Sequence, residues 1–232
     1  MELRADASRS GDDLRKAGDL SAHEFLMTEL AHLRPGDAVL SEEGKDNLAR
    51  LSAPRVWIVD PLDGTREFGE PGRTDWAVHV ALWSRGDLTA GAVALPAQGT
   101  VLSTAEPSPP LPEDAASERI RIVVSRSRPP GFVRDISGLI NAELVPLGSA
   151  GAKVAAVICG EVDAYVHGGG FYEWDTAAPV AVARAAGLHA SRIDGSALAY
   201  NQPDLLMPDI LVCRPAVAGI LLRAIREVTH AS

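Results

Sequence analysis

The sequence predicts a layered α/β protein with mixed sheets, because its two halves carry different periodicities. In the first half, residues 75–105 form three apolar, strand-like runs joined by short turns at 85–87 and 98–99, which is typical of an antiparallel meander. In the second half, short apolar runs alternate with helix-like segments. A Pro-rich, acidic segment at 106–118 separates the two patterns. We therefore expect an N-terminal lobe over residues 1–118 and a C-terminal lobe over residues 119–232.

The N-terminal lobe should begin with a capped helix and two short strands. Ser21, followed three residues later by Glu24, is a capping-box signature and predicts a helix that ends before Pro35-Gly36. Residues 38–40 predict a strand, and the run "VWIV" at 56–59 predicts a strand buried on both faces.

The C-terminal lobe should alternate strands and helices along the chain. We expect strands at 120–125, 142–147, 163–168 and 209–213, and helices at 132–141, 149–160, 175–187 and 216–229.

Composition excludes several classes of function. The net charge of −9, from 22 basic and 31 acidic residues, argues against a surface for a nucleic-acid polymer. The sequence has no run of about 18 apolar residues, so we expect no membrane span. The N-terminus lacks the apolar centre of a secretory signal, which predicts a cytoplasmic location. Cys159 and Cys213 lie among apolar residues and should be buried thiols, not a disulfide.

The end of the strand at 56–59 carries two carboxylates, Asp60 and Asp63. Asp60-Pro61 and Asp63-Gly64 are turn-forming pairs, so one interpretation is a plain loop. The other interpretation is a site, because the Pro and the Asp-Gly turn would fix the backbone so that both carboxylates converge.

Other acids in comparable places favour the site. Glu42 and Glu43 follow a short strand, and Asp19 precedes the expected helix. Asp175 precedes another helix, where it could also be only an N-cap. Acidic oxygens at strand ends and helix starts suit Mg²⁺, whereas the sequence has no His/Cys cluster for zinc.

At this point the motifs resemble a known superfamily. "DPLDGT" at 60–65, with "SEE" at 41–43 and "WDTAA" at 174–178, is similar to the signature of the magnesium-dependent, lithium-sensitive phosphatases. That group includes inositol monophosphatases and fructose-1,6-bisphosphatases. The resemblance implies a layered α/β/α/β/α sandwich, with an antiparallel sheet in the N-terminal lobe and a mixed sheet in the C-terminal lobe.

Within the superfamily, the chain looks most like the CysQ-type 3′-phosphoadenosine-5′-phosphate phosphatases, especially those of actinobacteria. This narrower resemblance rests on "REF" at 66–68, "SRSR" at 125–128, "GSAGAK" at 148–153 and "DGSALAY" at 194–200.

The resemblance also implies roles for particular residues. Two or three Mg²⁺ ions would be held by Glu42, Asp60, the Leu62 carbonyl, Asp63 and Asp175. The amides of Gly64 and Thr65 would cradle the scissile phosphate. Asp19, hydrogen-bonded to Thr65, would orient the attacking water together with Glu42 or Glu43. The implied substrate contacts are Glu42, Leu62, Asp63, Gly64, Thr65, Arg126, Gly148, Ser149, Lys153 and Asp175.

A second phosphate on the substrate would need cations of its own. Arg126, Arg128 and Lys153 are candidates, although the arginines could be plain surface charges and Lys153 an exposed helix residue. Amides following Gly148 and Ser149 could hold ribose or phosphate. Stacking of Phe171 or Tyr172 on a base is left open, and His79 on its alternating strand is interpreted as structural.

The chain departs from the family pattern near its N-terminus. Relatives usually have a long helix before the position of Asp19, and a Thr-x-Ala-Asp element where this sequence reads Lys16-Ala17-Gly18-Asp19. We therefore expect Asp19 to be held less firmly. Apolar surface exposed by a missing helix could be covered in a homodimer.

The leading hypothesis is a 3′(2′),5′-bisphosphate nucleotidase that converts 3′-phosphoadenosine-5′-phosphate to AMP and phosphate in sulfur metabolism. One alternative keeps the chemistry but acts on inositol phosphates or fructose 1,6-bisphosphate. Another is a nucleotide- or metal-binding module with little turnover.

Overall fold

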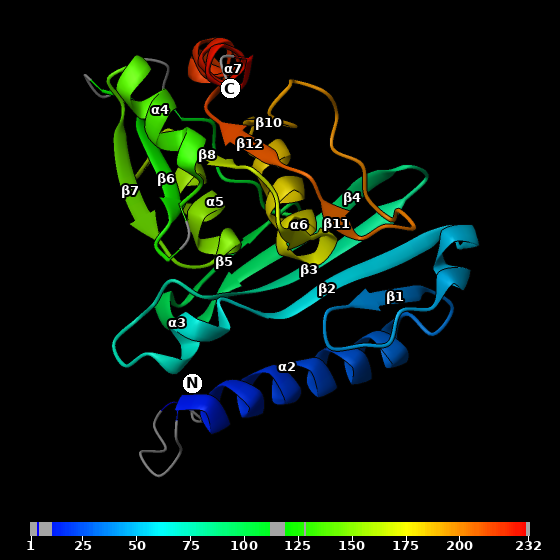
Figure 1. Cartoon of the computed structure of the whole chain (residues 1–232). Helices are drawn as coiled ribbons and strands as arrows, with labels where there is room; N and C mark the ends of the chain where they lie inside the picture. The colour runs from blue at the N-terminus through cyan, green and yellow to red at the C-terminus, as the bar shows by residue number, and fades with distance from the viewer. Residues whose placement is uncertain (1–3, 5–10, 112–118, 128, 231–232) are drawn as a thin grey trace.

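The computed structural model describes residue 4 and residues 11–111, 119–127 and 129–230. Helix α2 (Gly11–Leu33) lies under a first sheet, helices α5 and α6 lie between the two large sheets, and α4 and α7 cover the far side of the second sheet (Figure 1). The predicted layered α/β architecture is confirmed. The expected lobe boundary at 118/119 touches residues 112–118, which are outside the described part of the chain.

The first sheet is five-stranded, in the order β1-β2-β3-β4-β5. Its strands are β1 (Ala38–Ser41), β2 (Arg55–Asp63), β3 (Ala77–Ser84), β4 (Asp87–Leu95) and β5 (Thr100–Ser103). The strands β3, β4 and β5 form the antiparallel meander that the sequence predicts, and β2 adds to it in antiparallel, but β1 pairs with β2 in parallel. The prediction of an antiparallel sheet is therefore wrong for one strand, β1. The 3-10 helix η1 (Leu48–Ser52) lies in the crossover that a parallel pair requires.

The second sheet is also five-stranded and mixed, in the order β10-β12-β8-β6-β7. Its strands are β6 (Arg121–Ser125), β7 (Glu143–Leu147), β8 (Ala164–His167), β10 (His189–Ser191) and β12 (Ile210–Cys213). The β6-β7 and β6-β8 pairs are parallel, and the other two are antiparallel. A small ribbon of β9 (Phe171–Tyr172) and β11 (Leu206–Met207) stands apart from both sheets.

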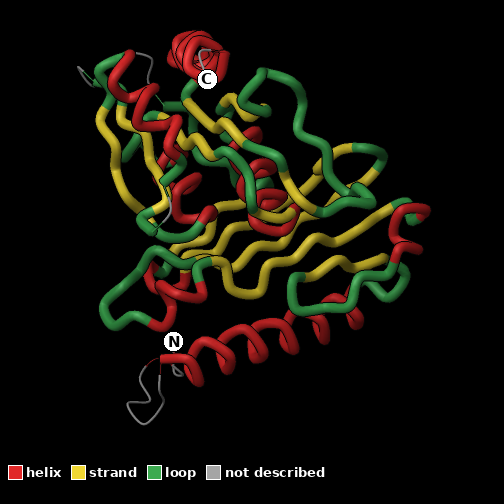
Figure 2. Tube along the Cα trace, viewed as in Figure 1, coloured by secondary structure: helices red, strands yellow, loops and turns green. Residues whose placement is uncertain are grey.

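The remaining helical segments pack around these sheets (Figure 2). They are α3 (Thr65–Gly69), η2 (Pro96–Gln98), α4 (Gly131–Leu139), α5 (Ala150–Ile158), α6 (Glu173–Ala185) and α7 (Pro215–His230). The longer ones match the helices that the sequence predicts, with ends shifted by a few residues.

The main core lies where α5 and α6 meet the first sheet. Small residues allow α6 to approach closely: a Cβ added at Gly91 of β4 would lie only 2.7 Å from the Cβ of Ala181. A second core, with Ile136 of α4 and Leu221 of α7, fills the space beneath the second sheet. Both sheets are therefore fixed against the helices that carry the candidate site.

The first helix differs from its prediction. Within the described residues it runs from Gly11 to Leu33, so Ser21 is an interior residue and not a cap. Packing against other parts of the chain explains the longer helix. Gly18 is buried, and a Cβ there would lie 2.5 Å from the Phe68 ring and 3.0 Å from the Leu62 side chain. Asp19 therefore lies within the helix, not ahead of it.

Both cysteines are free thiols, as predicted. Cys213 is buried, but Cys159 is exposed at the end of α5, so the expectation that both thiols are buried is wrong for Cys159. Among the described residues, no helix is both long and apolar enough to cross a membrane.

Candidate active site

The end of β2 carries the first two carboxylates. Asp60 and Asp63 are both buried, and the pairing between β2 and β3 shifts its register between them. Such an irregularity re-aims side chains at the end of a strand. The backbone N–H of Leu62 donates to Asp60 Oδ1 at 2.9 Å, and Gly64 follows with a φ of 87°, a conformation that favours glycine. The turn at 60–64 is therefore also part of the candidate site, so the two interpretations of this segment do not exclude each other.

Asp175 joins these two carboxylates from the other lobe. One oxygen from each of Asp60, Asp63 and Asp175 lies within 4.8 Å of the others. Asp175 is in the first turn of α6, where its Oδ2 accepts the backbone N–H of Tyr172 at 2.6 Å. The helix begins two residues earlier than predicted, so Asp175 is not the N-cap residue itself.

Glu42 and Asp19 approach the same group of acids. Desolvation, with the nearby charges of Asp19 and Glu43, raises the pKa of Glu42 to about 7, and the interaction of Glu42 with Asp60 works against this shift. The pKa of Asp19 is raised to about 6 by burial and by Glu43, although a hydrogen bond with the Thr65 side chain lowers it. The Thr65 hydroxyl also lies 3.2 Å from the Leu62 carbonyl oxygen. The structure thus places Asp19 beside Thr65, with Glu43 as a charged neighbour.

Burial and mutual repulsion make this cluster unfavourable without a cation. Burial, followed by the charge of Asp63, raises the pKa of Asp175 to about 7 and that of Asp60 well above its usual range. Asp60 Oδ2 is buried and has no hydrogen-bond partner among the described residues. An unpaired, buried carboxylate oxygen facing other carboxylates fits a hard cation such as Mg²⁺.

Asp63 differs from its neighbours because hydrogen-bond donors surround it. Its Oδ1 accepts the N–H of Ala150 at 3.2 Å, and its Oδ2 accepts that of Gly151 at 2.6 Å. Burial works to raise the pKa of Asp63, but His79, Lys153 and the Gly151 N–H outweigh it, and the pKa is lowered. Asp63 therefore stays ionised and connects β2 to the start of α5.

His79 is a site residue that the sequence does not reveal as one. It is completely buried, with Nε2 3.2 Å from Asp63 Oδ2 and Nδ1 3.2 Å from the Trp174 carbonyl oxygen. The sequence predicts a structural role for His79. The structure adds a contact between His79 and Asp63, which is a candidate metal ligand. The one available signal was its register, because His79 pairs directly with Asp60 across β2 and β3.

Lys153 is buried, so the alternative interpretation of it as an exposed helix residue, set beside its role as a candidate substrate contact, is wrong. Its ammonium group donates to the Gly148 carbonyl and lies 5.2 Å from the centre of the Tyr165 ring. Desolvation lowers its pKa, while Asp63 and Glu67 oppose the shift.

A cavity of about 670 Å³ opens beside the carboxylates, between the two lobes. The predicted residues that line it are Glu42, Asp63, Gly64, Thr65, Gly148, Ser149, Lys153 and Asp175. It is also lined by residues that the sequence did not single out for this site, namely Ser125, Ser127, Phe132, Tyr165 and His167. Phe171 and Tyr172, whose roles were left open, lie in the wall, and Tyr172 stacks on Trp174 with ring centres 4.9 Å apart.

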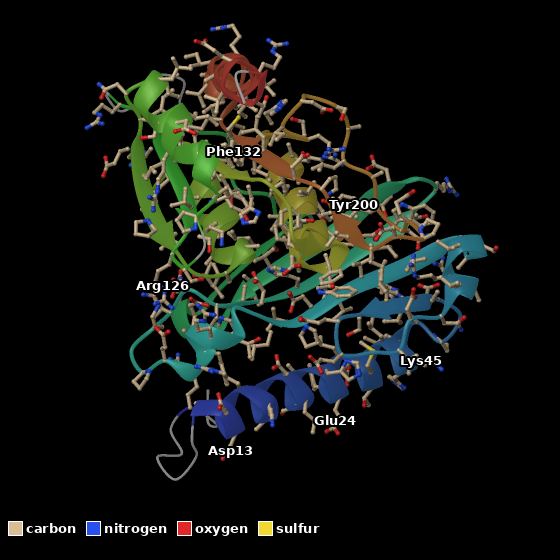
Figure 3. All side chains as sticks on the ribbon, in the orientation of Figure 1. Asp13, Glu24, Lys45, Arg126, Phe132 and Tyr200 are labelled. Atoms are coloured by element: carbon tan, nitrogen blue, oxygen red, sulfur yellow. The ribbon has the colours of Figure 1, made fainter. Side chains whose placement is uncertain are left out.

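Some predicted contacts are not in the cavity. Arg126 lies beside α3, where its Nη2 donates to Glu67 at 2.8 Å and to Glu70 at 2.9 Å, and it is not part of the cavity wall (Figure 3). Arg128 is outside the described residues.

The backbone N–H groups at 148–151, which we expected to be available to a ligand, already have acceptors within the protein. The Gly148 N–H donates to the Asp75 carboxylate and the Ser149 N–H to the Asp75 backbone carbonyl, while the N–H groups of Ala150 and Gly151 donate to the Asp63 carboxylate. These intramolecular acceptors argue against the prediction that the same amides hold ribose or phosphate, although Gly148 and Ser149 line the cavity.

Comparison with known proteins places this arrangement in a family. The family model described as "Inositol monophosphatase family" matches residues 2–230. The chain is 53% identical over 226 residues to a 3′-phosphoadenosine 5′-phosphate phosphatase of Mycobacterium tuberculosis, covering 92% of this chain and 82% of that one. It is 33% identical over 195 residues to the 3′(2′),5′-bisphosphate nucleotidase CysQ of Escherichia coli K12, covering 80% and 78%.

A solved structure supports the same assignment. CysQ from Bacteroides thetaiotaomicron, described as a bacterial member of the inositol monophosphatase family, superposes with a TM-score of 0.79 at 28% identity. The match covers 92% of this chain and 90% of that one. The chain that gathers these carboxylates therefore belongs to the inositol monophosphatase family.

Proposed function

We propose that this protein is a magnesium-dependent phosphomonoesterase that hydrolyses 3′-phosphoadenosine 5′-phosphate to AMP and inorganic phosphate. One observation carries the proposal: Asp60, Asp63 and Asp175, from two lobes, bring their oxygens within 4.8 Å of one another beside a cavity. The named activities of the mycobacterial and E. coli relatives support the choice of substrate.

The acidic residues would hold the metal. Glu42, Asp60, Asp63 and Asp175, with the carbonyl of Leu62, supply the oxygen donors that Mg²⁺ prefers. Bound Mg²⁺ supplies Lewis-acid stabilisation of the negative charge that develops on the phosphoryl and leaving oxygens.

The chain's own groups orient the water and handle its proton. Asp19 hydrogen-bonds Thr65, and its raised pKa suits a carboxyl that accepts a proton near neutral pH. Burial, and after it the neighbouring charge of Glu43, keeps the pKa of Asp19 high. We assign Asp19 and Thr65, together with Glu42 or Glu43, to orienting the attacking water. The water oxygen forms the new P–O bond while the bond from phosphorus to the 3′ oxygen breaks, and the proton that the water gives up is returned to the 3′ oxygen, which leaves as the 3′ hydroxyl of AMP.

Local cations allow an acidic protein to bind a polyanion. Arg66 and Lys153 line the cavity, and the buried ammonium group of Lys153 lies near Asp63 and Glu67. A cavity of about 670 Å³ is within the range of small-molecule sites. We assign the second phosphate of the substrate to the side of the cavity that holds Lys153.

A phosphate-release panel tests the function. The protein is assayed with 3′-phosphoadenosine 5′-phosphate, inositol 1-phosphate and fructose 1,6-bisphosphate, with Mg²⁺ and with EDTA. We expect release that requires Mg²⁺ and is fastest with the nucleotide. A preference for inositol phosphate or fructose bisphosphate would overturn the substrate assignment, and no Mg²⁺-dependent release from any of them would favour a binding module.

Participation in sulfate assimilation, a cytoplasmic location and assembly as a homodimer stay predictions that extend this proposal. Light scattering coupled to size-exclusion chromatography would test the homodimer directly.

A further inference from the structure

The candidate metal site draws on both lobes, so the position of Asp175 relative to β2 matters. Asp60 and Asp63 lie on β2, whereas Asp175 lies in the first turn of α6. α6 packs in the main core, to which Trp174 of its first turn and the residues from Ala177 onward belong. Hydrogen bonds from another segment also hold the first turn, which carries Asp175.

A segment of the C-terminal lobe, residues 200–205, lies over that first turn. The N–H of Glu173 donates to the Leu205 carbonyl at 3.0 Å, and the Tyr200 hydroxyl donates to Thr176 Oγ1 at 3.2 Å. Figure 3 labels Tyr200 beside α6. The position of the first turn therefore depends on how firmly this segment is held.

Glu173 attaches the segment from one side. Its side chain is completely buried, and its two carboxylate oxygens accept the N–H groups of Asn201 and Gln202, each at 2.7 Å. Asn201 has a φ of 59°, an unfavourable conformation for a residue other than glycine. The two hydrogen bonds to Glu173 help to hold the backbone in that conformation.

Arg50 attaches the same segment from the N-terminal lobe. It lies in η1, is 1% exposed, and donates to Asn201 Oδ1 at 2.6 Å and to the Gln202 carbonyl at 2.9 Å. Asp46 anchors its other side through two hydrogen bonds of 2.8 and 3.2 Å. Asp46 and Arg50 belong to the crossover that follows Glu42 and leads back into β2.

We propose that Arg50 and Glu173 are positioning residues, which hold Asp175 in register with the carboxylates of β2 by clamping the turn at 201–202 from both lobes. The inference rests on the proposed metal site. Neither residue needs to touch the metal or the substrate. Each one helps to fix the backbone that positions Asp175, as residues behind the metal ligands do in other metal sites.

A purely structural role is the alternative, and it makes a different prediction. Replacing either residue leaves buried hydrogen-bonding groups without partners, which lowers stability wherever such a residue lies. Only a positioning role also weakens metal binding in the protein that remains folded.

Glu173→Gln separates the two roles. Glutamine keeps the size of the side chain but has one acceptor oxygen in place of two, so one of the two N–H groups loses its partner. Binding of Mg²⁺ alone is measured by calorimetry on the folded protein. We expect affinity to fall roughly 10-fold, the loss typical when a residue behind a ligand is changed.

The matched control is Asp163→Asn. Asp163 is also a buried carboxylate that accepts a backbone N–H, from Arg121 at 2.8 Å, and it contacts the buried Arg214 at 3.3 Å. It precedes β8, whose opposite end, His167, lines the cavity. We expect this variant to lose stability while its Mg²⁺ affinity stays within about twofold of wild type. Residues that share no contact and no partner with the metal ligands couple to them only weakly.

Hydrogen exchange of the wild-type protein keeps the proposal testable if Glu173→Gln does not fold. Coupling between two sites is reciprocal, so bound Mg²⁺ should slow exchange at the N–H groups of Asn201 and Gln202. Exchange that is unchanged there by Mg²⁺ would overturn the proposal, as would a folded Glu173→Gln protein that binds Mg²⁺ like the wild type. If the wild type itself binds no Mg²⁺, the proposed function fails as well, which is a separate result.

Discussion

The Asp63 carboxylate accepts the backbone N–H of Gly151 at 2.6 Å, and this contact ties the end of β2 to the start of α5. The approach requires glycine. A Cβ at position 151 would overlap the imidazole of His79 and lie 2.8 Å from the Cβ of Ala77 and 3.2 Å from Asp63 Oδ2.

Gly151→Ala should therefore damage both the fold and the site. We expect a loss of about 1–3 kcal/mol in the free energy of unfolding, as for other overpacked positions, measured by urea denaturation. Phosphate release should fall because Asp63 moves. Gly138→Ala is the control: Gly138 lies in α4 with no atom within 4 Å of the added Cβ, so stability should rise by about 0.5–1 kcal/mol. A Gly151→Ala protein as stable as wild type would contradict the close contact.

Asp63→Asn should remove a ligand while keeping the size of the side chain. We expect phosphate release to fall by at least roughly 100-fold, because even residues behind a metal ligand contribute 10- to 100-fold. The rise in melting temperature on adding Mg²⁺ should also be lost, since a ligand stabilises only in proportion to its binding. A variant that keeps both properties would remove Asp63 from the metal site.

His79→Asn should weaken metal binding through Asp63. The shorter side chain cannot span from the Trp174 carbonyl to Asp63, which His79 contacts at 3.2 Å on each side. We expect Mg²⁺ affinity to fall roughly 10-fold by calorimetry, with kcat at saturating Mg²⁺ changing much less. If kcat fell while Mg²⁺ affinity did not, the contact would have a role other than holding a metal ligand.

Lys153→Met should change the choice of substrate more than the chemistry. Methionine has a similar length and no charge, so the ratio of kcat/KM for 3′-phosphoadenosine 5′-phosphate to that for inositol 1-phosphate should fall. One charge-assisted hydrogen bond corresponds to roughly 10-fold. Steady-state kinetics with both substrates measures the ratio, and equal losses on the two would contradict a role in binding the second phosphate.

The metal-free protein should lose stability as the pH rises. Folding raises the pKa of Glu42 and Asp175 to about 7 and that of Asp19 to about 6, from usual values of 4.5 for Glu and 3.8 for Asp. Between about pH 4 and 7 the folded state therefore binds more protons than the unfolded state, and its stability falls as those protons leave.

Thermal unfolding in EDTA across this range measures the effect. Asp175→Asn should flatten the decline, because the variant lacks one of the titrating groups. Mg²⁺ should reverse the decline in the wild type by replacing the lost protons with a cation. A wild type whose stability in EDTA rises toward pH 7, or falls no more steeply than that of Asp175→Asn, would contradict this explanation.

The sequence predicted the layers and the identity of the acids because both depend on short-range signals. Alternation and strand-end carboxylates are visible without tertiary structure. Contacts between distant segments cannot be seen without the tertiary structure. The first helix extends past Ser21 because Gly18 packs on Phe68, far along the chain.

The same limitation explains the errors around the site. The amides at 148–151 resembled a ligand cradle, but Asp63 and Asp75 occupy them. The depth of Lys153 and the contact of His79 with Asp63 also arise where two lobes meet, which no local pattern encodes. The parallel pairing of β1 with β2 likewise depends on a crossover whose path is set by packing.

Asp60, Asp63 and Asp175 should bind divalent ions together, and a crystal soaked in Mn²⁺ would reveal this. The anomalous difference map should show manganese within coordinating distance of oxygens from these aspartates. A well-ordered crystal with no peak there, or with manganese bound only elsewhere, would contradict the account.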